Sequence, residues 1–258
     1  MKIIVLNENF AGLNYRAEHG LSYLIKADKE ILFDTGSSDL FLINAKKLGI
    51  NINKIDTIVL SHGHWDHGNG LMFLKNKNLI CHPDCFIKRY RKKDKTYVGI
   101  ELSLEEAHKR FVPILSKNPY KISKDITFLG EIPRVNNFES KSTPFQKENN
   151  IDDFVMDDSA VFVKSEKGLI IITGCSHSGI CNIIEHAKKV SGINNVYAVI
   201  GGFHLKTLDE ITNKTIEYLK NQKIKHILPS HCTGFPVLSK FNELFNSKII
   251  KSGDIIEF

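Results

Sequence analysis

The sequence of 258 residues has no apolar run long enough to cross a membrane, which takes about 18 consecutive apolar residues. Near the start, the apolar stretch Ile3–Leu6 is followed at once by Asn7 and Glu8, whereas the apolar region of a secretory signal is longer. We therefore expect neither a membrane partner nor an export signal. Ile3–Leu6 is interpreted as part of a first β-strand.

Cysteine is scarce, with five residues, and no two of them are spaced as Cys-x-x-Cys. An odd number of cysteines in a chain of this length argues against a disulfide framework. Disulfides are also rare in the reducing cytosol. The cysteine pattern therefore predicts a cytoplasmic protein with free thiols.

Acidic residues are outnumbered: 29 Asp and Glu stand against 35 Lys and Arg, which gives a net charge of +6. Much of the excess lies in one run, Lys88–Lys95, which we interpret as a solvated surface, with contact of Lys88, Arg89 and Arg91 to a substrate phosphate as the alternative. No aromatic or arginine-rich nucleic-acid motif accompanies this run, so a nucleic-acid partner is not expected. A modest positive field instead favours small anionic ligands.

Apolar segments of strand length alternate with segments of helical periodicity, which predicts a layered α/β domain. Strands are expected at Lys2–Leu6, Leu21–Lys26, Ile31–Phe33, Thr57–Leu60, Ala160–Val163, Leu169–Thr173, Val196–Ile200 and His226–Leu228. Helices are expected at Asp39–Leu48, Gly179–Val190, Asp209–Asn221 and Val237–Phe245.

The middle of the chain differs from its ends. Residues 92–158 are richer in Lys, Asn, Ser and Pro and show little periodicity. We interpret them as an insertion placed to cover a site, with some β-structure at Ile126–Leu129, within a single domain of residues 1–258. The sequence leaves open whether the protein forms homo-oligomers.

Four predicted strands are each followed within a few residues by a histidine. These are His62, His177, His204 and His231. In layered α/β sheets, the loops at the strand ends gather along one edge, where ligands bind. We therefore expect the four histidines to approach one another.

The first of these strands leads into a dense group of polar residues. His62, His64, Asp66 and His67 lie within six positions. Imidazole nitrogen and carboxylate oxygen are both good zinc ligands. His62 and His64 are one residue apart, so their side chains point the same way from an extended chain. Asp66 and His67 follow at the turn into a helix and can address a second ion, so the group predicts a metal centre.

The pattern His62-x-His64-x-Asp66-His67 after an apolar strand resembles the signature of the metallo-β-lactamase superfamily. Two further segments, Phe33–Gly36 and Pro229–His231, resemble other motifs of that family. The resemblance implies an αββα sandwich with the metal site on one edge, between the two sheets. It implies one ion held by His62, His64 and His177, and a second ion held by Asp66, His67 and His231.

The chain departs from the common family pattern at Thr173–Cys175, where the expected strand Leu169–Thr173 ends. Most members have aspartate where this chain has Cys175, and a histidine ahead of that strand where this chain has Asp157–Ser159. His177 is taken as the substitute ligand. The Cys175 thiolate is a further candidate, since zinc binds sulfur readily, and a packing role is the alternative. We expect one or two divalent ions, zinc above all, with manganese, iron or magnesium as alternatives.

A narrower resemblance comes from the segments Thr173–Gly179, Gly201–Leu205 and Ser230–Gly234. They resemble the subgroup named for 7,8-dihydropterin-6-methyl-4-(β-D-ribofuranosyl)aminobenzene-5′-phosphate synthase. This implies a metal-dependent enzyme acting on a phosphorylated or diphosphorylated small molecule. One alternative is a metal-dependent phosphoesterase or other hydrolase. An alternative of another class is a non-enzymatic metal-binding or redox module.

Individual roles follow from this resemblance and from local chemistry. Asp66 is expected to bind metal and to orient a hydroxide, since a zinc-type ion lowers the pKa of bound water to about 7. His204 follows two glycines and is expected to contact a substrate oxygen and act in catalysis, with a structural role as the alternative. Ser176 and Ser178 precede a helix whose free N–H groups bind phosphate, with N-capping by Ser178 as the alternative. His19 has no companion in the sequence and is expected to have no functional role.

Overall fold

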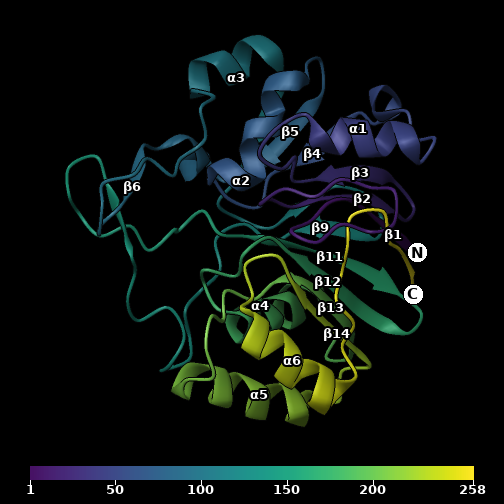
Figure 1. The fold of residues 1–258 in the computed structure, drawn as a ribbon, viewed down its shortest axis with the longest axis vertical. Coiled ribbons are helices and arrows are strands. Elements are labelled where there is room, and N and C mark those ends of the chain that lie inside the picture. Colours follow the sequence, from purple (N-terminus) through teal and green to yellow (C-terminus); the bar gives the residue numbers. More distant parts are fainter.

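In the computed structural model, which describes residues 1–258, two β-sheets lie face to face and helices cover their outer sides (Figure 1). The αββα sandwich expected from the sequence is therefore confirmed. None of the helices is long and apolar enough to span a membrane.

The first sheet has seven strands in the order β15-β1-β2-β3-β4-β5-β7. Their bounds are β1 Lys2–Asn7, β2 Ser22–Lys26, β3 Glu30–Phe33, β4 Thr57–Val59, β5 Asn78–Cys81, β7 Val112–Leu115 and β15 Ile255–Glu257. Strands β3, β4, β5 and β7 run parallel, and the others are antiparallel. Helices α1 (Leu40–Lys47) and α3 (Leu104–Arg110) lie on its outer side (Figure 1). Phe41 and Ala45 of α1 pack there against Leu24 and Leu32.

The second sheet has six strands in the order β14-β13-β12-β11-β9-β8. Their bounds are β8 Tyr120–Lys121, β9 Ile126–Phe128, β11 Ala160–Ser165, β12 Gly168–Thr173, β13 Val196–Gly202 and β14 His226–Ser230. Strands β12, β13 and β14 are parallel. Their outer side is covered by α4 (Ile180–Ser191), α5 (Glu210–Gln222) and α6 (Phe235–Phe245).

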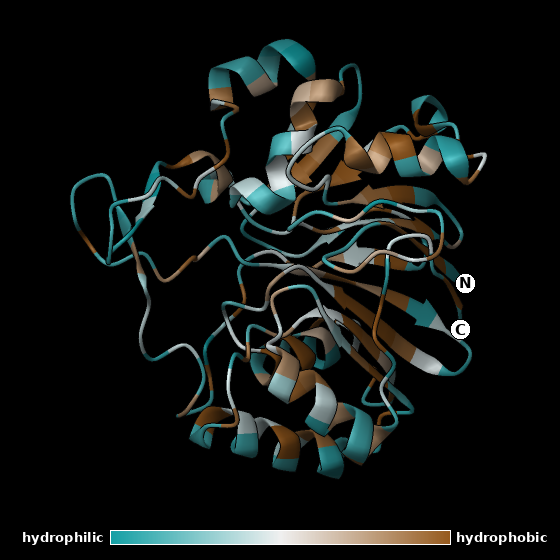
Figure 2. Ribbon diagram, viewed as in Figure 1, coloured by the Kyte–Doolittle hydropathy of each residue, from teal (hydrophilic) through white to brown (hydrophobic).

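Strand β12 shows why the apolar runs of the sequence are so nearly continuous. Ile170 and Ile172 face the first sheet, and Leu169 and Ile171 face the helices. Because both faces of this strand are buried, it needs apolar residues at every position. Figure 2 accordingly shows hydrophobic residues along the inner strands and hydrophilic residues on the outer turns of the helices.

All eight strands and four helices expected from the sequence are present, with their ends shifted by one or two residues. The β-structure expected near Ile126 is confirmed as β9. Sequence patterns missed α3 (Leu104–Arg110), β15 and the short strands β5, β6 (Arg89–Arg91), β7, β8 and β10 (Phe145–Lys147). Short 3₁₀ helices lie at Ile52–Lys54, Asn69–Phe73 and Pro83–Phe86.

The segment 92–158 is not one continuous insertion, because parts of it complete both sheets. Strand β7 extends the first sheet, and β8 and β9 extend the second. Only the flanking loops stand away from the body. There β6 (Arg89–Arg91) pairs antiparallel with β10 (Phe145–Lys147) and forms the lobe at the left of Figure 1.

Candidate metal centre

The loops that carry the four expected histidines meet at one edge of the sandwich. Strands β12, β13 and β14 are parallel, so their carboxyl ends lie together and lead to His177, His204 and His231. Strand β4 of the first sheet ends opposite them and leads to His62. Helix α2 (Trp65–Gly68) then begins inside the histidine motif.

The structure brings His62, His64 and His177 together, and we call them the first metal group. Nδ1 of His64 lies 3.0 Å from Nε2 of His62 and 3.2 Å from Nε2 of His177. Ligand nitrogens on a tetrahedral zinc ion at 2.0–2.1 Å lie about 3.3 Å apart, so these atoms have the spacing of metal ligands. Burial lowers the pKa of all three imidazoles well below the usual value, which keeps them in the neutral form that binds metal.

The second metal group contains Asp66, His67 and His231. Nε2 of His231 lies 3.1 Å from Nε2 of His67 and 3.2 Å from Oδ2 of Asp66. Sγ of Cys175 lies 3.2 Å from Nε2 of His67, on the side toward the first group. The same sulfur, His67 and His62 all offer ligand atoms within 4.8 Å of one another. Cys175 therefore lies between the two groups, where it can bind either ion or both.

The donor atoms of these groups cannot satisfy one another by hydrogen bonding. Nδ1 of His64 faces two other ring nitrogens, and a single N–H serves only one of them. Nε2 of His67 likewise faces both a ring nitrogen and a thiol. Nitrogen, carboxylate oxygen and sulfur together form the donor set that zinc prefers. The residues therefore fit a pair of divalent ions.

A second layer of side chains orients the ligands. Nδ1 of His67 donates to Oδ2 of Asp34 at 2.7 Å, which leaves Nε2 free for metal. The same carboxylate accepts from the backbone N–H and the hydroxyl of Ser61, each at 2.7 Å. Burial alone would lower the pKa of His67, but Asp66 and Asp34 outweigh it and raise that pKa to about 9, so a metal ion that binds Nε2 displaces a proton from it. The motif Phe33–Gly36 thus contributes a supporting carboxylate.

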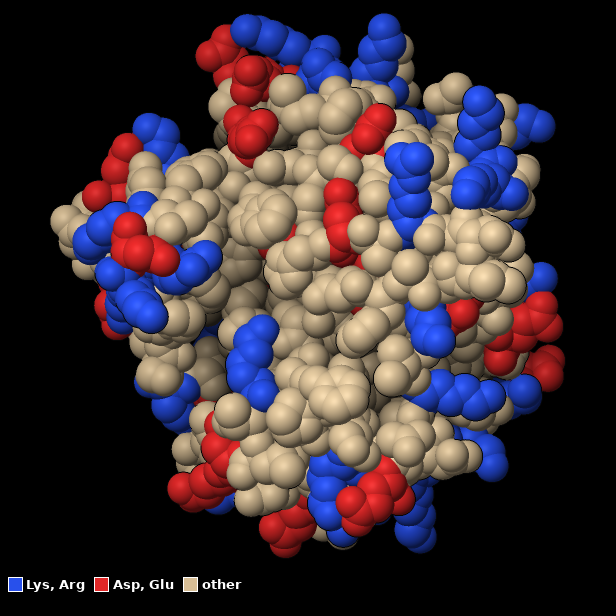
Figure 3. Space-filling view, viewed as in Figure 1, with Lys and Arg blue, Asp and Glu red and all other residues tan.

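The metal groups open into a cavity of about 360 Å³, which we call the metal cavity. Four ligands line it: His64, Asp66, Cys175 and His177. Two cations, Arg91 and Lys206, and two aromatic residues, Trp65 and Phe145, also line it. Figure 3 shows the surface hollowed between the β6–β10 lobe and the body, with Lys and Arg side chains near the hollow. The surroundings suit an anionic ligand.

His204 lines the same cavity but belongs to neither metal group. Its ring packs against that of His177, with centroids 4.4 Å apart and an interplanar angle of 51°. Its backbone is held in the left-handed region at φ 51°, which residues other than glycine rarely adopt. Burial and the nearby Lys206 lower its pKa to about 3, so the imidazole is neutral.

The start of α4 is not free to bind phosphate, so that expectation is wrong. Its backbone N–H groups at Cys181 and Asn182 already donate to the carboxylate of Glu139, each at 3.0 Å. Ser178 is fully buried and its hydroxyl bonds to Asp158. The hydroxyl of Ser176 donates to the Gly202 carbonyl at 2.7 Å. The expected N-cap role of Ser178 is also wrong, because Gly179 occupies that position.

Sequence reasoning missed His19. Its Nε2 lies 3.1 Å from Oδ2 of Asp66, and its ring lies against those of Trp65 and His231. The sequence carried no signal for this contact, because His19 stands in a loop 47 positions before Asp66. Lys206 was also missed, although it follows His204 by only two positions.

The basic run Lys88–Lys95 is only partly a solvated surface. Arg91 lines the metal cavity, and Arg89 is completely buried. The Arg89 guanidinium bonds to Asp157 at 2.8 Å, and Asp157 accepts from the backbone N–H of Gly63 at 2.7 Å. Arg89 thereby supports the loop that carries His62 and His64.

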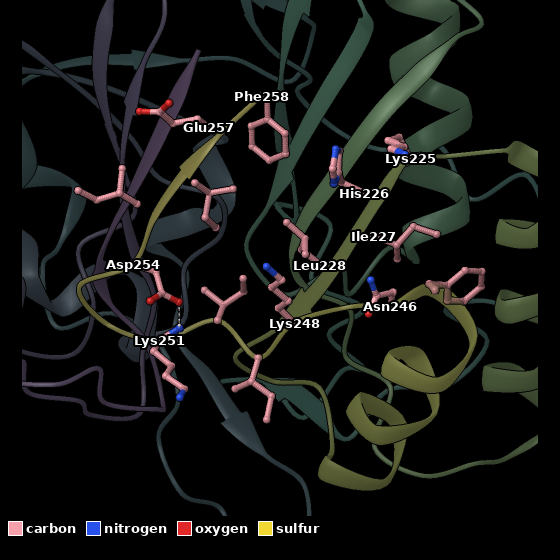
Figure 4. A pocket seen from close by; sticks show the side chains of 15 residues that line it. Lys225, His226, Ile227, Leu228, Asn246, Lys248, Lys251, Asp254, Glu257 and Phe258 are labelled. Atoms are coloured by element: carbon pink, nitrogen blue, oxygen red, sulfur yellow. Dashed lines mark hydrogen bonds between the residues drawn. The ribbon is translucent and has the colours of Figure 1, made fainter.

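A larger cavity, of about 850 Å³, lies far from this centre, between β14, the end of α6 and the C-terminal segment (Figure 4). It contains no metal group. Its one histidine, His226, faces the hydroxyl of Tyr197 at 3.3 Å. The volume of a cavity therefore does not identify the candidate site in this protein. The clustered metal-binding atoms identify it instead.

Residues 15–188 match the family model described as the metallo-β-lactamase superfamily. The chain is 38% identical to the 7,8-dihydropterin-6-methyl-4-(β-D-ribofuranosyl)-aminobenzene-5′-phosphate synthase of Methanocaldococcus jannaschii, over 100% of this chain and 97% of that protein. It is also 38% identical to an uncharacterized protein of that organism, MJ0448, over 98% of this chain and 99% of the relative.

Among solved structures, the chain is similar to Tm1679, described as a metal-dependent hydrolase of the β-lactamase superfamily. The TM-score is 0.88 at 30% identity, over 100% of this chain and 99% of the other. The similarity therefore extends over the whole length of the chain, and the metal groups lie within it.

Proposed function

Because the chain belongs to the metallo-β-lactamase superfamily, we propose that its metal centre acts on a phosphorylated or diphosphorylated small molecule. The observation that carries this proposal is the metal cavity, in which the ligands face Arg91 and Lys206. Phosphate oxygens are bound strongly by metal ions and by charged N–H donors. No free carboxylate other than the ligand Asp66 lines this cavity, so nothing there repels an anion.

Divalent ions bound by the two groups would lower the pKa of a bound water and polarise phosphate oxygens. Asp66 is placed to accept a hydrogen bond from a nucleophile or a water beside the second group, because it lines the metal cavity. His204 is neutral and faces the cavity, so its ring N–H can donate to a phosphate oxygen. Lys206 adds a positive charge beside it.

The aromatic residues have a separate role. Trp65 and Phe145 form part of the wall, and Phe145 packs on His64 with ring centroids 4.7 Å apart. Their rings exclude water from the metal groups, which strengthens the interaction of charges inside the cavity. The same rings provide an apolar surface for the organic part of a substrate.

Within this function, we favour a transfer reaction of the kind named for the M. jannaschii synthase. That relative is 38% identical, and the metal-dependent hydrolase of known structure is 30% identical, each over the whole of this chain. Transfer with loss of diphosphate and hydrolysis of a phosphate ester both require stabilised leaving oxygens. Hydrolysis is therefore the second candidate, supported by the similarity to Tm1679.

We further propose zinc as the resident metal and the cytoplasm as the location. Zinc is favoured by the presence of a thiol among nitrogen and oxygen donors. A reducing compartment is supported by five buried cysteines that are all free.

The test is the binding of inorganic diphosphate to the zinc-loaded protein, measured by titration calorimetry. Lys206→Gln should weaken binding by at least about tenfold, because a hydrogen bond to a charged group contributes about 1.5–3 kcal/mol. The matched control is Lys214→Gln, which removes an exposed lysine on α5 that lies outside the cavity. Zinc-loaded protein that binds no diphosphate, or equal affinities for both variants, would contradict the proposal.

A further inference from the structure

A second cavity, of about 240 Å³, adjoins the metal cavity, and we call it the side cavity. The two cavities share Pro144, His177 and His204 in their walls. The rings of His177 and His204 pack against each other there, with centroids 4.4 Å apart and an interplanar angle of 51°. A group in the side cavity therefore lies beside a histidine pair that also faces the metal cavity.

The side cavity is lined by apolar side chains and by side chains that carry hydroxyl groups. The apolar residues are Pro144, Phe154, Val155, Phe203, Leu205 and Ile211. The hydroxyls belong to Ser140, Ser142, Thr143 and Ser176. Two charged residues line the cavity: Glu139, whose carboxylate already accepts two backbone N–H groups of α4, and Lys141, which is exposed to solvent. This lining fits an uncharged ring better than a charged group.

The walls of the side cavity are fixed by Arg134. Its Nε donates to the hydroxyl of Ser140 at 2.9 Å, and its Nη2 donates to the carbonyl of Phe154 at 2.7 Å. One side chain thus ties together two loops that are 14 positions apart in the sequence. Ligand sites are usually formed before the ligand binds, and this cross-link preserves the shape of the cavity.

Backbone strain is concentrated around the side cavity. Ser140, Val155, Ser176 and His204 have φ values of 53°, 53°, 57° and 51°. They are four of the twelve residues other than glycine with positive φ, and all four line this one small cavity. Val155 is β-branched, for which this conformation is a true outlier. Strain of this kind gathers at sites that bind ligands.

We propose that the side cavity binds an aryl group of the reactant whose phosphate is held in the metal cavity; this rests on the proposed function. The ring lies between Phe154 and Ile211 and against the His177–His204 pair. Together the two cavities offer about 600 Å³, within the range of 300–1,000 Å³ that is usual for small-molecule sites. The substrate class is thus an aryl phosphate or diphosphate.

The experiment compares phenyl phosphate with methyl phosphate, which carry the same anion with and without a ring. Calorimetry on the zinc-loaded protein should show phenyl phosphate binding about tenfold more tightly, or 1.4 kcal/mol. Ile211→Trp, which fills the side cavity, should abolish this difference and leave the affinity for methyl phosphate and the zinc content unchanged. Leu208→Trp is the matched control, because Leu208 is 50% exposed nearby and does not line the cavity.

Equal affinities of the native protein for the two phosphates would overturn the proposal, and so would an Ile211→Trp variant that keeps the difference. Failure of the proposed function looks different, since neither phosphate would then bind. In that case phenol serves as the probe, with the methyl resonances of Ile211 followed by NMR. If phenol shifts these resonances in the native protein but not in Phe154→Trp, the result supports binding of a ring in the side cavity. If phenol leaves the resonances of the native protein unshifted, the proposal is overturned.

Discussion

Replacing Asp34 by asparagine removes one negative charge beside the second metal group while the shape of the side chain is kept. Asp34 is completely buried, and its Oδ2 accepts from Nδ1 of His67 at 2.7 Å. In the variant, the asparagine oxygen keeps the bond to the backbone N–H of Ser61. Its amide nitrogen then faces His67, and two N–H donors cannot face each other.

The imidazole of His67 therefore changes tautomer in this variant. Nδ1 loses its proton and accepts from the amide, and Nε2 gains the proton and can no longer bind metal. Loss of such a supporting partner typically lowers metal affinity 10–100-fold, or about 1.4–2.7 kcal/mol. We expect the second ion to be weakened by at least this factor and the first ion to be retained.

The assay is zinc titration by calorimetry, together with ¹⁵N NMR of the histidine rings to identify the tautomer of His67. Asp56→Asn is the matched control, because Asp56 is an exposed carboxylate that lies far from both metal groups. An Asp34→Asn variant with unchanged affinity for both zinc ions would refute the reasoning, as would an unchanged tautomer of His67.

Three further predictions follow from buried groups. Arg89→Met leaves Asp157 as an uncompensated buried charge and should lower the free energy of unfolding by about 3–5 kcal/mol, measured by urea denaturation; a change under about 1 kcal/mol would contradict this. Gly63→Ala places a Cβ 1.9 Å from the carbonyl oxygen of Cys85, so zinc content should fall, and full zinc content would show that the loop can shift freely. Burial raises the pKa of Glu8 to about 7, so its stabilising contribution is complete below pH 4.5 and is lost as the pH rises through 7. The metal-free native protein should therefore lose stability relative to Glu8→Gln between pH 5 and pH 8 in thermal denaturation, and parallel pH profiles would contradict this.

The metal ligands could be predicted because four of them lie within six positions and the others follow long buried strands. Buried strands can be recognised in the sequence because both of their faces must be apolar, as in β12. Strand β7 was missed for the opposite reason, because it is short and partly exposed at the sheet edge. The ends of β12 and β14, which place His177 and His231, were located to within two residues.

Contacts between distant segments could not be predicted from local patterns. His19 reaches Asp66, and Glu139 reaches the start of α4, only through the tertiary fold. Ser178 looked like an N-cap, since serine favours that position, but burial directed its hydroxyl to Asp158. Arg89 looked like a surface residue, because a run of basic residues does not reveal which member pairs with a buried carboxylate.

The most direct test of the central claim is the metal content of the chain, measured by plasma mass spectrometry on protein purified without chelator and without added metal. The His62→Ala/His64→Ala variant is measured beside it, and His108→Ala, at an exposed position on α3, serves as the control. We predict close to two equivalents of metal for the native protein and the control, and a clear loss for the double variant. One equivalent or less in the native protein, unchanged after zinc is supplied, would contradict a dinuclear centre built with Cys175 and His177.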